Sequence, residues 1–468
     1  MHSLSHIRKM AIITSFLKGE RYGLLGPQLA GTVIEQHTPC RCIVIAVARD
    51  DDKAVLEKSL GDYFGSRMPV VGFTALSGRT DLYEFAGELK NKGSVTLLAG
   101  PQAAVDFSGE VGWKEHPHRF RGVSDCFSFA LQGPAEQIIP LFISSGQKDP
   151  CQIPGLVYRS EAGLFFQNPA SPWDQKYLGR VDWNRLHTVS DTGLTALPVE
   201  MGQVLQHIGC PHAARKGEIE IDYPVALSKD AAKKVRIGTR GCSFCDVAAD
   251  KGFHGKLGLD AVVGQIAHLP VGADGRKIPF ELINESPLPG LAELLEEVAQ
   301  RGIPIRQVNL TLRADWLAAG GDSLRRALQT ARRVDARILL SSIGFESFDD
   351  TILKNLNKGL TREKNLAAVR LIRRLKEDFP HQLGYTSGEG AIHGFIHPTP
   401  WDSQRTEAAI QKTISFYGLQ QDILPPHSTP LIIHHASALA EWIRRIERRE
   451  NIRYRRHGSI IAWWDSPL

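Results

Sequence analysis

Two cysteines separated by two residues stand out as groups that could do chemistry. Cys242 and Cys245 lie in the stretch Val235–Val247, VRIGTRGCSFCDV. A tight loop turns two thiolates at this spacing to the same side, where both can reach one metal ion or cluster. Gly241 lets the backbone turn just before them. Taken alone, the spacing fits zinc, an iron–sulfur cluster or a redox dithiol.

Residues 230–435, which contain these cysteines, alternate strand and helix patterns. The predicted strands are Val235–Thr239, Ile278–Ile283, Ile305–Leu312, Ala336–Ile343 and Ala391–Ile396. This alternation predicts a TIM-type partial (β/α) barrel, whose chemistry lies at the carboxyl ends of its strands. Because Val235–Thr239 is expected to be the first barrel strand, Cys242 and Cys245 would lie at that rim. Ser347 and Asp350 predict a capping box for the helix after the fourth strand.

Residues 1–149 show the same alternation and predict a separate domain. Apolar runs such as Met10–Phe16 and Cys42–Ala48 alternate with helical patterns such as Lys53–Phe64. Continuous apolar strands of this kind predict an N-terminal doubly wound parallel (Rossmann-like) sheet, with its ligand beyond the carboxyl ends of the strands. The candidate ligand residues at those ends are Ser77, Gly100, Pro101, Gln102 and Gly133. They either let a flat ligand approach the backbone or only form turns.

Two further segments are less regular. Residues 150–229 are interpreted as a linker and entry segment, with a hairpin whose turn lies at Glu161–Gly163. Residues 436–468 are interpreted as a C-terminal helix and tail. Their arginines alternate with glutamates, which indicates a solvated helix face, with a phosphate-bearing partner as the alternative.

Length and composition narrow the class of protein. A chain of 468 residues with 42% hydrophobic and 23% charged residues is typical of a soluble protein of two or three domains. The net charge of +5 is too small to argue for nucleic acid. We find no apolar run of the roughly 18 residues that a membrane helix needs. Seven cysteines without a secretory signal favour the cytoplasm.

Several of these stretches together resemble the radical S-adenosylmethionine (SAM) enzymes of the subgroup with an N-terminal cobalamin-binding-type domain. The sequence RGCSFCDV at Arg240–Val247 is similar to the family's cluster loop, and IGFESFDDTILKNLNKGLT at Ile343–Thr361 is similar to its fourth-strand segment. Asn309–Asp315 resembles the third strand, and the small-residue loops of the first domain suit a corrin ring. The resemblance covers most of the chain.

The resemblance implies three cofactors: a [4Fe–4S] cluster, SAM and cobalamin. It places the cluster on Cys242 and Cys245, because thiolates are soft ligands that suit iron–sulfur clusters. It also implies roles in binding SAM: Phe244 near the adenine, Glu346 near the ribose or the amino acid, Asn284 and Glu285 near the amino group, and Arg313 near the carboxylate. Ser77, Gly100, Pro101, Gln102 and Gly133 would contact cobalamin.

The chain departs from the family in two places. The family has three cluster cysteines, C-x-x-x-C-x-aromatic-C, whereas this chain has two of them. Cys210 is the first candidate for the third ligand, and His254 is a non-thiolate alternative. The first domain also lacks Asp-x-His-x-x-Gly, the loop that supplies a cobalt-binding histidine in many cobalamin proteins, so we expect cobalamin without a protein histidine on cobalt.

Two functions of different classes follow. The first is a cobalamin-dependent radical SAM enzyme, most simply a methyltransferase acting on an unactivated carbon of a small molecule, peptide or natural-product intermediate, with rearrangement or cyclisation as variants. It would need an electron donor of the flavodoxin or ferredoxin type. The second is a degenerate relative that binds a tetrapyrrole, a nucleotide or a partner protein without radical chemistry. A plain zinc protein would need two more ligands at suitable spacing, which the sequence near Cys242 does not offer.

Overall fold

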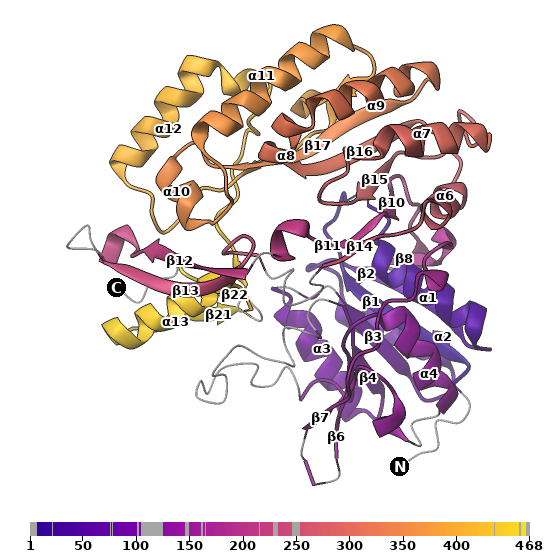
Figure 1. The fold of residues 1–468 in the computed structure, drawn as a ribbon. Helices are drawn as coiled ribbons and strands as arrows, with labels where there is room; N and C mark the ends of the chain where they lie inside the picture. Colours follow the sequence, from indigo (N-terminus) through magenta and orange to yellow (C-terminus); the bar gives the residue numbers. More distant parts are fainter. Residues whose placement is uncertain are drawn as a thin grey trace.

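The computed structural model describes residues 7–20, 22–74, 76, 78–100, 103, 125–145, 149–160, 162–163, 165–214, 216–227, 233–245, 253–434, 436–457 and 460–464. These residues form two main sheets, one built by the first part of the chain and one by the second (Figure 1). Ser77, Pro101 and Gln102, which we predicted to contact cobalamin, lie outside the described residues, as does the side chain of His254.

The first sheet is doubly wound, as the sequence predicts. Its central strands are parallel, with β1 between β2 and β3, and antiparallel strands add to both edges. Because the chain adds strands on both sides of β1, its connecting helices lie on both faces of the sheet. In spatial order the described strands are β7 (Phe165–Gln167), β6 (Leu156–Arg159), β5 (Phe129–Leu131), β4 (Val95–Leu98), β3 (Val70–Thr74), β1 (Lys9–Ser15), β2 (Arg41–Val47), β8 (Leu186–Ser190) and β9 (Gly193–Ala196).

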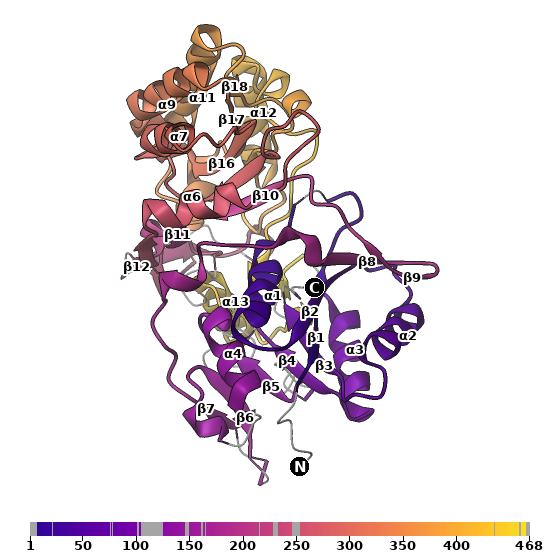
Figure 2. The same cartoon turned by 90° about the vertical axis from the view of Figure 1, so that its right-hand side faces the viewer.

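Two pairs of helices cover the two faces of this sheet (Figure 2). Helices α1 (Leu25–His37) and α4 (Ala135–Ser145) pack on one face, and α2 (Lys53–Phe64) and α3 (Thr80–Asn91) pack on the other. Alternation along β1 explains the division, because Met10 and Ile12 join the first core while Ala11 and Ile13 join the second. Both faces are apolar, which is why the strands read as continuous hydrophobic runs.

The second sheet forms the predicted partial barrel. Its described strands are parallel and run in the order β10 (Gly202–Leu205), β15 (Phe280–Ile283), β16 (Gln307–Arg313) and β17 (Arg337–Glu346), with β18 (Leu383–Gly384) and β19 (Gly394–Phe395) both paired with β17. The helices between the strands lie outside the sheet (Figure 1). They are α6 (Leu259–Ala267), α7 (Leu291–Gln300), α8 (Ala314–Ala319), α9 (Gly321–Arg333), α10 (Asp350–Asn355), α11 (Arg362–Asp378) and α12 (Gln404–Tyr417).

The prediction that Val235–Thr239 is the first barrel strand is wrong. These residues belong to β13 (Lys234–Arg240), which pairs antiparallel with β12 (Lys216–Asp222) in a two-stranded sheet of its own. The sequence of β13 alternates buried Val235 and Ile237 with exposed charged residues, which is the pattern of a half-exposed hairpin. Strand β10 takes the first position of the barrel instead. The cysteines therefore follow a hairpin strand rather than a barrel strand.

The segment 150–229 also differs from a simple linker. Strands β6 to β9 extend the first sheet, and β10 begins the second one before residue 230. The predicted hairpin is present as β6 and β7, paired antiparallel. Strand β11 (His207–Gly209) then pairs with β14 (Phe253–Lys256). The segment has enough β-forming residues to be structured, but its short strands carry little periodicity, so the sequence did not reveal their partners.

The start of helix α10 differs in detail from the predicted capping box. Asp349, rather than Ser347, is the N-cap, and its carboxylate accepts hydrogen bonds from the backbone N–H groups of Thr351 and Ile352 at 2.9 and 3.0 Å. The Ser347 hydroxyl accepts from the N–H of Asp349, 3.1 Å away, one turn earlier. An aspartate is as good an N-cap as a serine, so the prediction placed the N-cap two residues too early.

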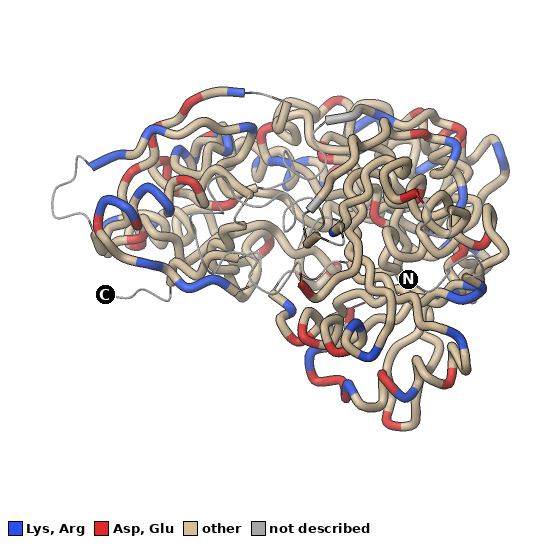
Figure 3. Tube along the Cα trace, turned by 90° about the horizontal axis from the view of Figure 1, so that it is seen from below, with Lys and Arg blue, Asp and Glu red and all other residues tan. Residues whose placement is uncertain are grey.

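The last part of the chain packs against the cysteine hairpin. Helix α13 (Ala438–Glu450) lies along β13, and β20 (Ile433–His434), β21 (Arg455–His457) and β22 (Ile460–Ala462) form a small antiparallel sheet beside it (Figure 1). Arginines of this region pair with its own glutamates, such as Arg444 with Glu441 at 3.1 Å. Basic and acidic positions are interleaved along the chain trace (Figure 3). Among the described residues, no helix combines the length and apolar character needed to cross a bilayer.

The antiparallel pairing of β12 and β13 can be tested by cross-linking. Gly217 and Thr239 lie directly opposite each other, and a side chain added at Gly217 meets no atom within 4 Å. We expect the variant Gly217→Cys/Thr239→Cys to form a disulfide under mild oxidation, because directly opposed residues in such pairs lie within disulfide reach. Peptide mapping by mass spectrometry would detect it. Glu220→Cys/Thr239→Cys is the matched control and should stay reduced. Equal cross-linking of both pairs would contradict the register.

Candidate functional site

A cavity of about 380 Å³ lies where the carboxyl ends of the first sheet face the second sheet. From the first sheet and its helices it is lined mainly by apolar or small residues, including Met10, Ile12, Ala30, Leu97 and Leu131. Ligands of doubly wound sheets bind beyond the carboxyl ends of the strands, at the point where the strand order reverses. The cavity occupies that place, and its volume falls in the range of ligand pockets.

Glycines at the strand ends keep this wall of the cavity flat. Gly100 and Gly133 both line the cavity and both have positive φ angles, +77° and +89°. At Gly100 a Cβ atom would lie 2.4 Å from the Thr74 hydroxyl oxygen, so even alanine would need a rearrangement. Two of the predicted cobalamin contacts thus lie in one cavity, and glycine is required at Gly100 for both conformation and space.

The opposite wall of the cavity carries several polar groups and comes from the second sheet and from β11. These groups are Gln203 in β10, His207 in β11, and Asn284 and Glu285 directly after β15. Asn284 is held in place, because its amide donates to the side-chain oxygen of Gln206 at 2.8 Å. Burial lowers the pKa of His207. Of the described lining residues, the charged carboxylates are Glu285 and Glu136, and none is a lysine or arginine. The cavity therefore suits a ligand that is cationic or rich in hydrogen-bond donors.

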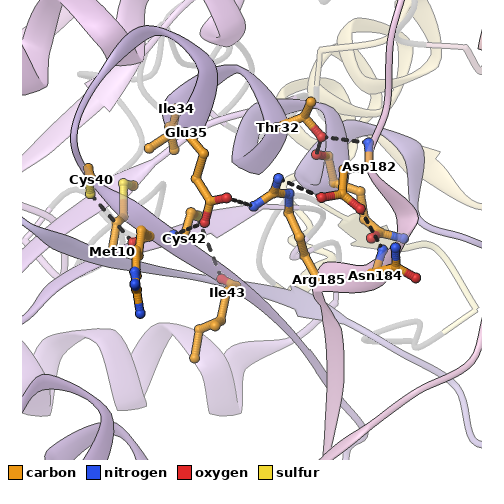
Figure 4. Close-up of polar contacts among 12 residues, drawn as sticks. Met10, Thr32, Ile34, Glu35, Cys40, Cys42, Ile43, Asp182, Asn184 and Arg185 are labelled. Carbon is orange, nitrogen blue, oxygen red and sulfur yellow. Dashed lines mark hydrogen bonds and ion pairs between the residues drawn. The ribbon is translucent and has the colours of Figure 1, made fainter. Parts of the chain in front are cut away.

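Helix α1, which supplies much of the apolar wall, is fixed by a partly buried ion network (Figure 4). Arg185 pairs with Glu35 of the helix and, at 2.8 Å, with Asp182. The same Glu35 carboxylate accepts from the backbone N–H of Cys42 at 2.7 Å, and the Thr32 hydroxyl accepts from that of Asp182 at 2.9 Å. These bonds tie the helix to β2 and to the segment before β8. The wall of the cavity is thus held rigidly in position.

The cysteine loop is held by hydrogen bonds to two elements and by close packing against a third. Ser243 donates through its backbone N–H to Leu356 at 2.9 Å and through its hydroxyl to Asn355 at 2.8 Å. Its carbonyl accepts from the N–H of Leu439, 2.8 Å away at the start of α13. Gly241, with a φ angle of +70°, places its α-carbon so close to Ala213 that a side chain would clash with that backbone. The loop conformation is therefore fixed on all sides.

Within this loop the sulfur of Cys242 lies beside two positive charges. An N–H of Arg313 donates to it at 3.5 Å, and the same guanidinium also pairs with Asp315 at 3.0 Å. Burial raises the pKa of the Cys242 thiol, and the charges of Lys358 and Arg313 offset part of that increase. Burial likewise raises the pKa of Cys210, with smaller increases from Glu285 and Cys242. The structure thus brings Cys210 and Cys242 into one electrostatic environment, next to Arg313.

Glu346 ends β17 in a buried ion pair. Its carboxylate lies 2.6 Å from Lys358 Nζ, and both side chains are about nine-tenths buried. Burial lowers the pKa of Lys358, but the Glu346 charge outweighs it, so the pKa lies above its usual value. The ammonium also lies 5.9 Å from the centre of the Phe244 ring, a cation–π distance. Glu346 and Phe244, both predicted SAM contacts, are therefore brought together, with Lys358 between them.

These distances separate the predicted residues into two groups. Gly100, Gly133, Asn284 and Glu285 line the cavity, whereas Cys242, Arg313, Glu346 and Phe244 surround the buried Lys358. The electrostatic effect of Glu285 on Cys210 links the two groups. Arg313 does not face the cavity, since its guanidinium is engaged by Asp315, Cys242 and the Lys358 carbonyl.

The donor set for a cubane cluster is incomplete in the described part of the chain. No group of three histidine, cysteine, aspartate or glutamate side chains there is close enough to share a metal ion. The N–H of Arg313 instead occupies one side of the Cys242 sulfur. The described residues thus show no assembled set of three thiolates, whereas the glycine-lined apolar wall fits a large flat ligand.

Sequence reasoning missed Lys358, Gln203 and His207. Lys358 stands in the motif NKGLT, which we assigned to the fourth-strand segment without giving its lysine a role. Gln203 and His207 lie in strands that the sequence did not predict. Among the other cysteines, Cys40 and Cys42 are buried and Cys151 is exposed.

The chain matches no protein-family model and none of the curated proteins. Solved structures do match it. Those of the cobalamin-dependent SAM radical enzyme OxsB with aqua-cobalamin and SAM bound, and with aqua-cobalamin bound, each have a TM-score of 0.60 and 13% sequence identity over 97% of this chain. The chain has the fold of OxsB. The apo, SeMet-labelled OxsB structure gives a TM-score of 0.59 at 12% identity.

The match to OxsB confirms the predicted fold class, a Rossmann-like sheet followed by a partial barrel. It extends over both sheets and the C-terminal region, because 97% of this chain is covered. The chain spans 64% of the length of OxsB, so OxsB contains further sequence that has no counterpart here. At 13% identity the likeness concerns the fold, and it leaves the ligands of this chain to be argued from its own residues.

The buried ion pair can be tested through stability. We expect Lys358→Met to lower the free energy of unfolding by about 3–5 kcal/mol, because it leaves the Glu346 carboxylate buried without a counter-charge. Adding Glu346→Gln removes that charge, so the double variant should be more stable than the single one. Urea unfolding followed by circular dichroism measures both. The matched control is the exposed Lys364→Met, expected within about 0.5 kcal/mol of wild type. A double variant less stable than Lys358→Met would contradict the pairing.

Proposed function

We propose that the chain is a cobalamin-dependent enzyme of the radical SAM class that acts on a small molecule. The observation that carries the proposal is the cavity between the two sheets, with a flat, glycine-containing wall at the carboxyl ends of the first sheet. OxsB, which shares the fold over almost the whole chain, holds aqua-cobalamin and SAM. Both observations support a corrin ring in the cavity.

In this proposal the first sheet binds the corrin and the second sheet faces it with the substrate. Gly100, Gly133 and the apolar side chains of α1 form the face on which the ring lies. On the opposite wall, the Asn284 amide can donate hydrogen bonds to the ligand and the Glu285 carboxylate can accept them. Bound cobalamin and SAM would supply methyl transfer or radical chemistry on an unactivated carbon.

The type of reaction is inferred from the two proposed cofactors. Methyl transfer is the simplest reaction for this pair of cofactors, with rearrangement or cyclisation as variants on the same architecture. A reductive SAM reaction also requires an electron donor of the flavodoxin or ferredoxin type, and a cytoplasmic location would supply it. The apolar and hydrogen-bonding walls of the cavity suit a small-molecule or natural-product substrate.

A second candidate function is favoured by the cysteine site. Because Arg313 donates to Cys242 and the described residues offer no three-ligand group, the chain can serve as a corrin-binding protein without a standard cluster. It would then carry or deliver a tetrapyrrole, or assist a partner enzyme. The two candidates share the corrin cavity and differ in iron and SAM chemistry, so separate experiments distinguish them.

The corrin site is tested by filling the cavity. Ala135 lines it at the first residue of α4, and we expect Ala135→Trp to weaken cobalamin binding by at least about tenfold, or about 1.4 kcal/mol, because the indole occupies ring space. Absorbance titration with aqua-cobalamin measures the affinity. Ala54→Trp, on the exposed side of α2, is the control and should bind like wild type. If wild type takes up no cobalamin, the cavity assignment fails.

The cluster is tested by anaerobic reconstitution with iron and sulfide. For the enzyme, we expect about four irons per chain, as in a cubane, and reductive cleavage of SAM to 5′-deoxyadenosine. Cys242→Ala and Cys245→Ala should abolish both, and Cys210→Ala should do so if it is the third ligand. Cys151→Ala, an exposed cysteine, is the control. A wild-type protein that binds cobalamin but holds no iron and leaves SAM intact would establish the second candidate.

A further inference from the structure

A histidine that the proposed function does not use lies at the rim of the second sheet. His397 follows β19, the strand that pairs in parallel with the end of β17. The backbone N–H of its neighbour Ile396 donates to the carbonyl of Glu346 at 2.8 Å, so His397 stands at the level where β17 ends. Side chains at the carboxyl ends of parallel barrel strands are where such folds carry out chemistry.

His397 is paired with a carboxylate in a defined orientation. Its Nδ1 lies 3.1 Å from Oδ2 of Asp402. Because a carboxylate only accepts, the hydrogen of the neutral ring must sit on Nδ1, and Nε2 then carries the lone pair. The His397 side chain is 37% exposed, whereas that of Asp402 is 8% exposed. The histidine is therefore open to a ligand, and its carboxylate partner is shielded from water.

The turn that carries Asp402 is held rigidly. The backbone N–H of Thr399 donates to the same oxygen, Oδ2, that accepts from His397. Between them, the indole N–H of buried Trp401 donates to the carbonyl of Asp222 at 2.9 Å, and its ring lies 5.4 Å from that of Trp442. A site that fixes its groups in this way holds them ready for reaction without further rearrangement.

The second oxygen of Asp402 is a separate sign of function. Oδ1 is buried and has no hydrogen-bond partner among the described residues. A buried acceptor left unpaired costs free energy, and native proteins keep such groups mainly where a site needs them. Oδ2 of the same carboxylate accepts from the backbone N–H of Thr399 and faces Nδ1 of His397, so the polar contacts of Asp402 are gathered on the side of the histidine.

The neighbouring His393 has a structural role and can be compared with His397. His393 is 3% exposed, and both of its ring nitrogens are used inside the protein. Its Nδ1 accepts from the N–H of Ile343 at 3.2 Å, and its Nε2 lies 2.6 Å from the carbonyl of Tyr385. His397 differs on both counts, because it is partly exposed and its partner is a carboxylate rather than the backbone.

We propose that His397 and Asp402 form a proton-transfer dyad at the rim of the second sheet. Nε2 of His397 takes a proton from a small-molecule ligand that presents a hydroxyl or ammonium group. The ligand is left one charge more negative, the ring becomes an imidazolium stabilised by Asp402, and the proton then passes to water. Asp402 is a positioning residue. The dyad stands on its own geometry and does not depend on cobalamin or iron.

The orientation of the ring is tested by nuclear magnetic resonance on the full chain labelled with ¹⁵N-histidine, with His397→Gln used for assignment. The neutral ring of His397 should carry its hydrogen on Nδ1 in wild type. Asp402→Ala should abolish that preference, because no carboxylate is left to accept. A wild-type ring with its hydrogen on Nε2, or an Asp402→Ala ring unchanged from wild type, overturns the dyad.

The reactivity of Nε2 is tested with diethyl pyrocarbonate, which acylates neutral imidazole, and mapped by mass spectrometry. His393 should stay unmodified, and the exposed His268, whose Nδ1 is 2.7 Å from the Gly264 carbonyl, is the accessible reference. We expect His397 to react several-fold faster than His268. Asp402→Asn keeps the shape but removes the charge, so it should lower the His397 rate to that of His268. An unchanged rate in a variant that unfolds like wild type overturns the proposal.

Discussion

One buried ion pair, between Glu346 and Lys358, holds together the region where the cysteine loop meets the second sheet. The pair joins the end of β17 to the turn after α10, and the Lys358 carbonyl accepts from Arg313 at the end of β16. Residues just before Lys358 in turn bind the backbone of the cysteine loop. Two charges taken out of water are costly unless they stay together, so this pair fixes one arrangement of three elements.

The space around this ion pair is also restricted. Gly344 lies so close that a Cβ atom there would be 2.8 Å from Lys358 Nζ and 2.9 Å from a Glu346 oxygen. Glu346 itself adopts a φ angle of +59°, an unusual conformation for a residue with a side chain. Such strain persists only where surrounding contacts determine it, and here the ion pair supplies them. The family-like segment around Glu346 thus has a structural reason to be kept, apart from any cofactor.

The sequence predicted those parts of the molecule whose signal is local. Helix α2 begins and ends where its periodicity indicates, and the predicted strands other than Val235–Thr239 lie within a few residues of strands in the two main sheets. The pairing of β13 escaped prediction because partners are not encoded in one strand, although the alternation of Val235 and Ile237 with charged residues was visible. Lys358 escaped because its role depends on Glu346, which lies beside it only after folding.

The contact between the C-terminal helix α13 and the cysteine loop determines when the loop can fold during synthesis. The Ser243 carbonyl is held by the N–H of Leu439, and α13 covers the strand that leads to Cys242. Chains emerge from the ribosome N-terminus first, so the first sheet can form early while the loop waits for α13, about 200 residues later, to be synthesised. Any metal or cofactor that needs the loop in this conformation must therefore be inserted after α13 has emerged, and a chain cut before α13 would lack this support for its cysteines.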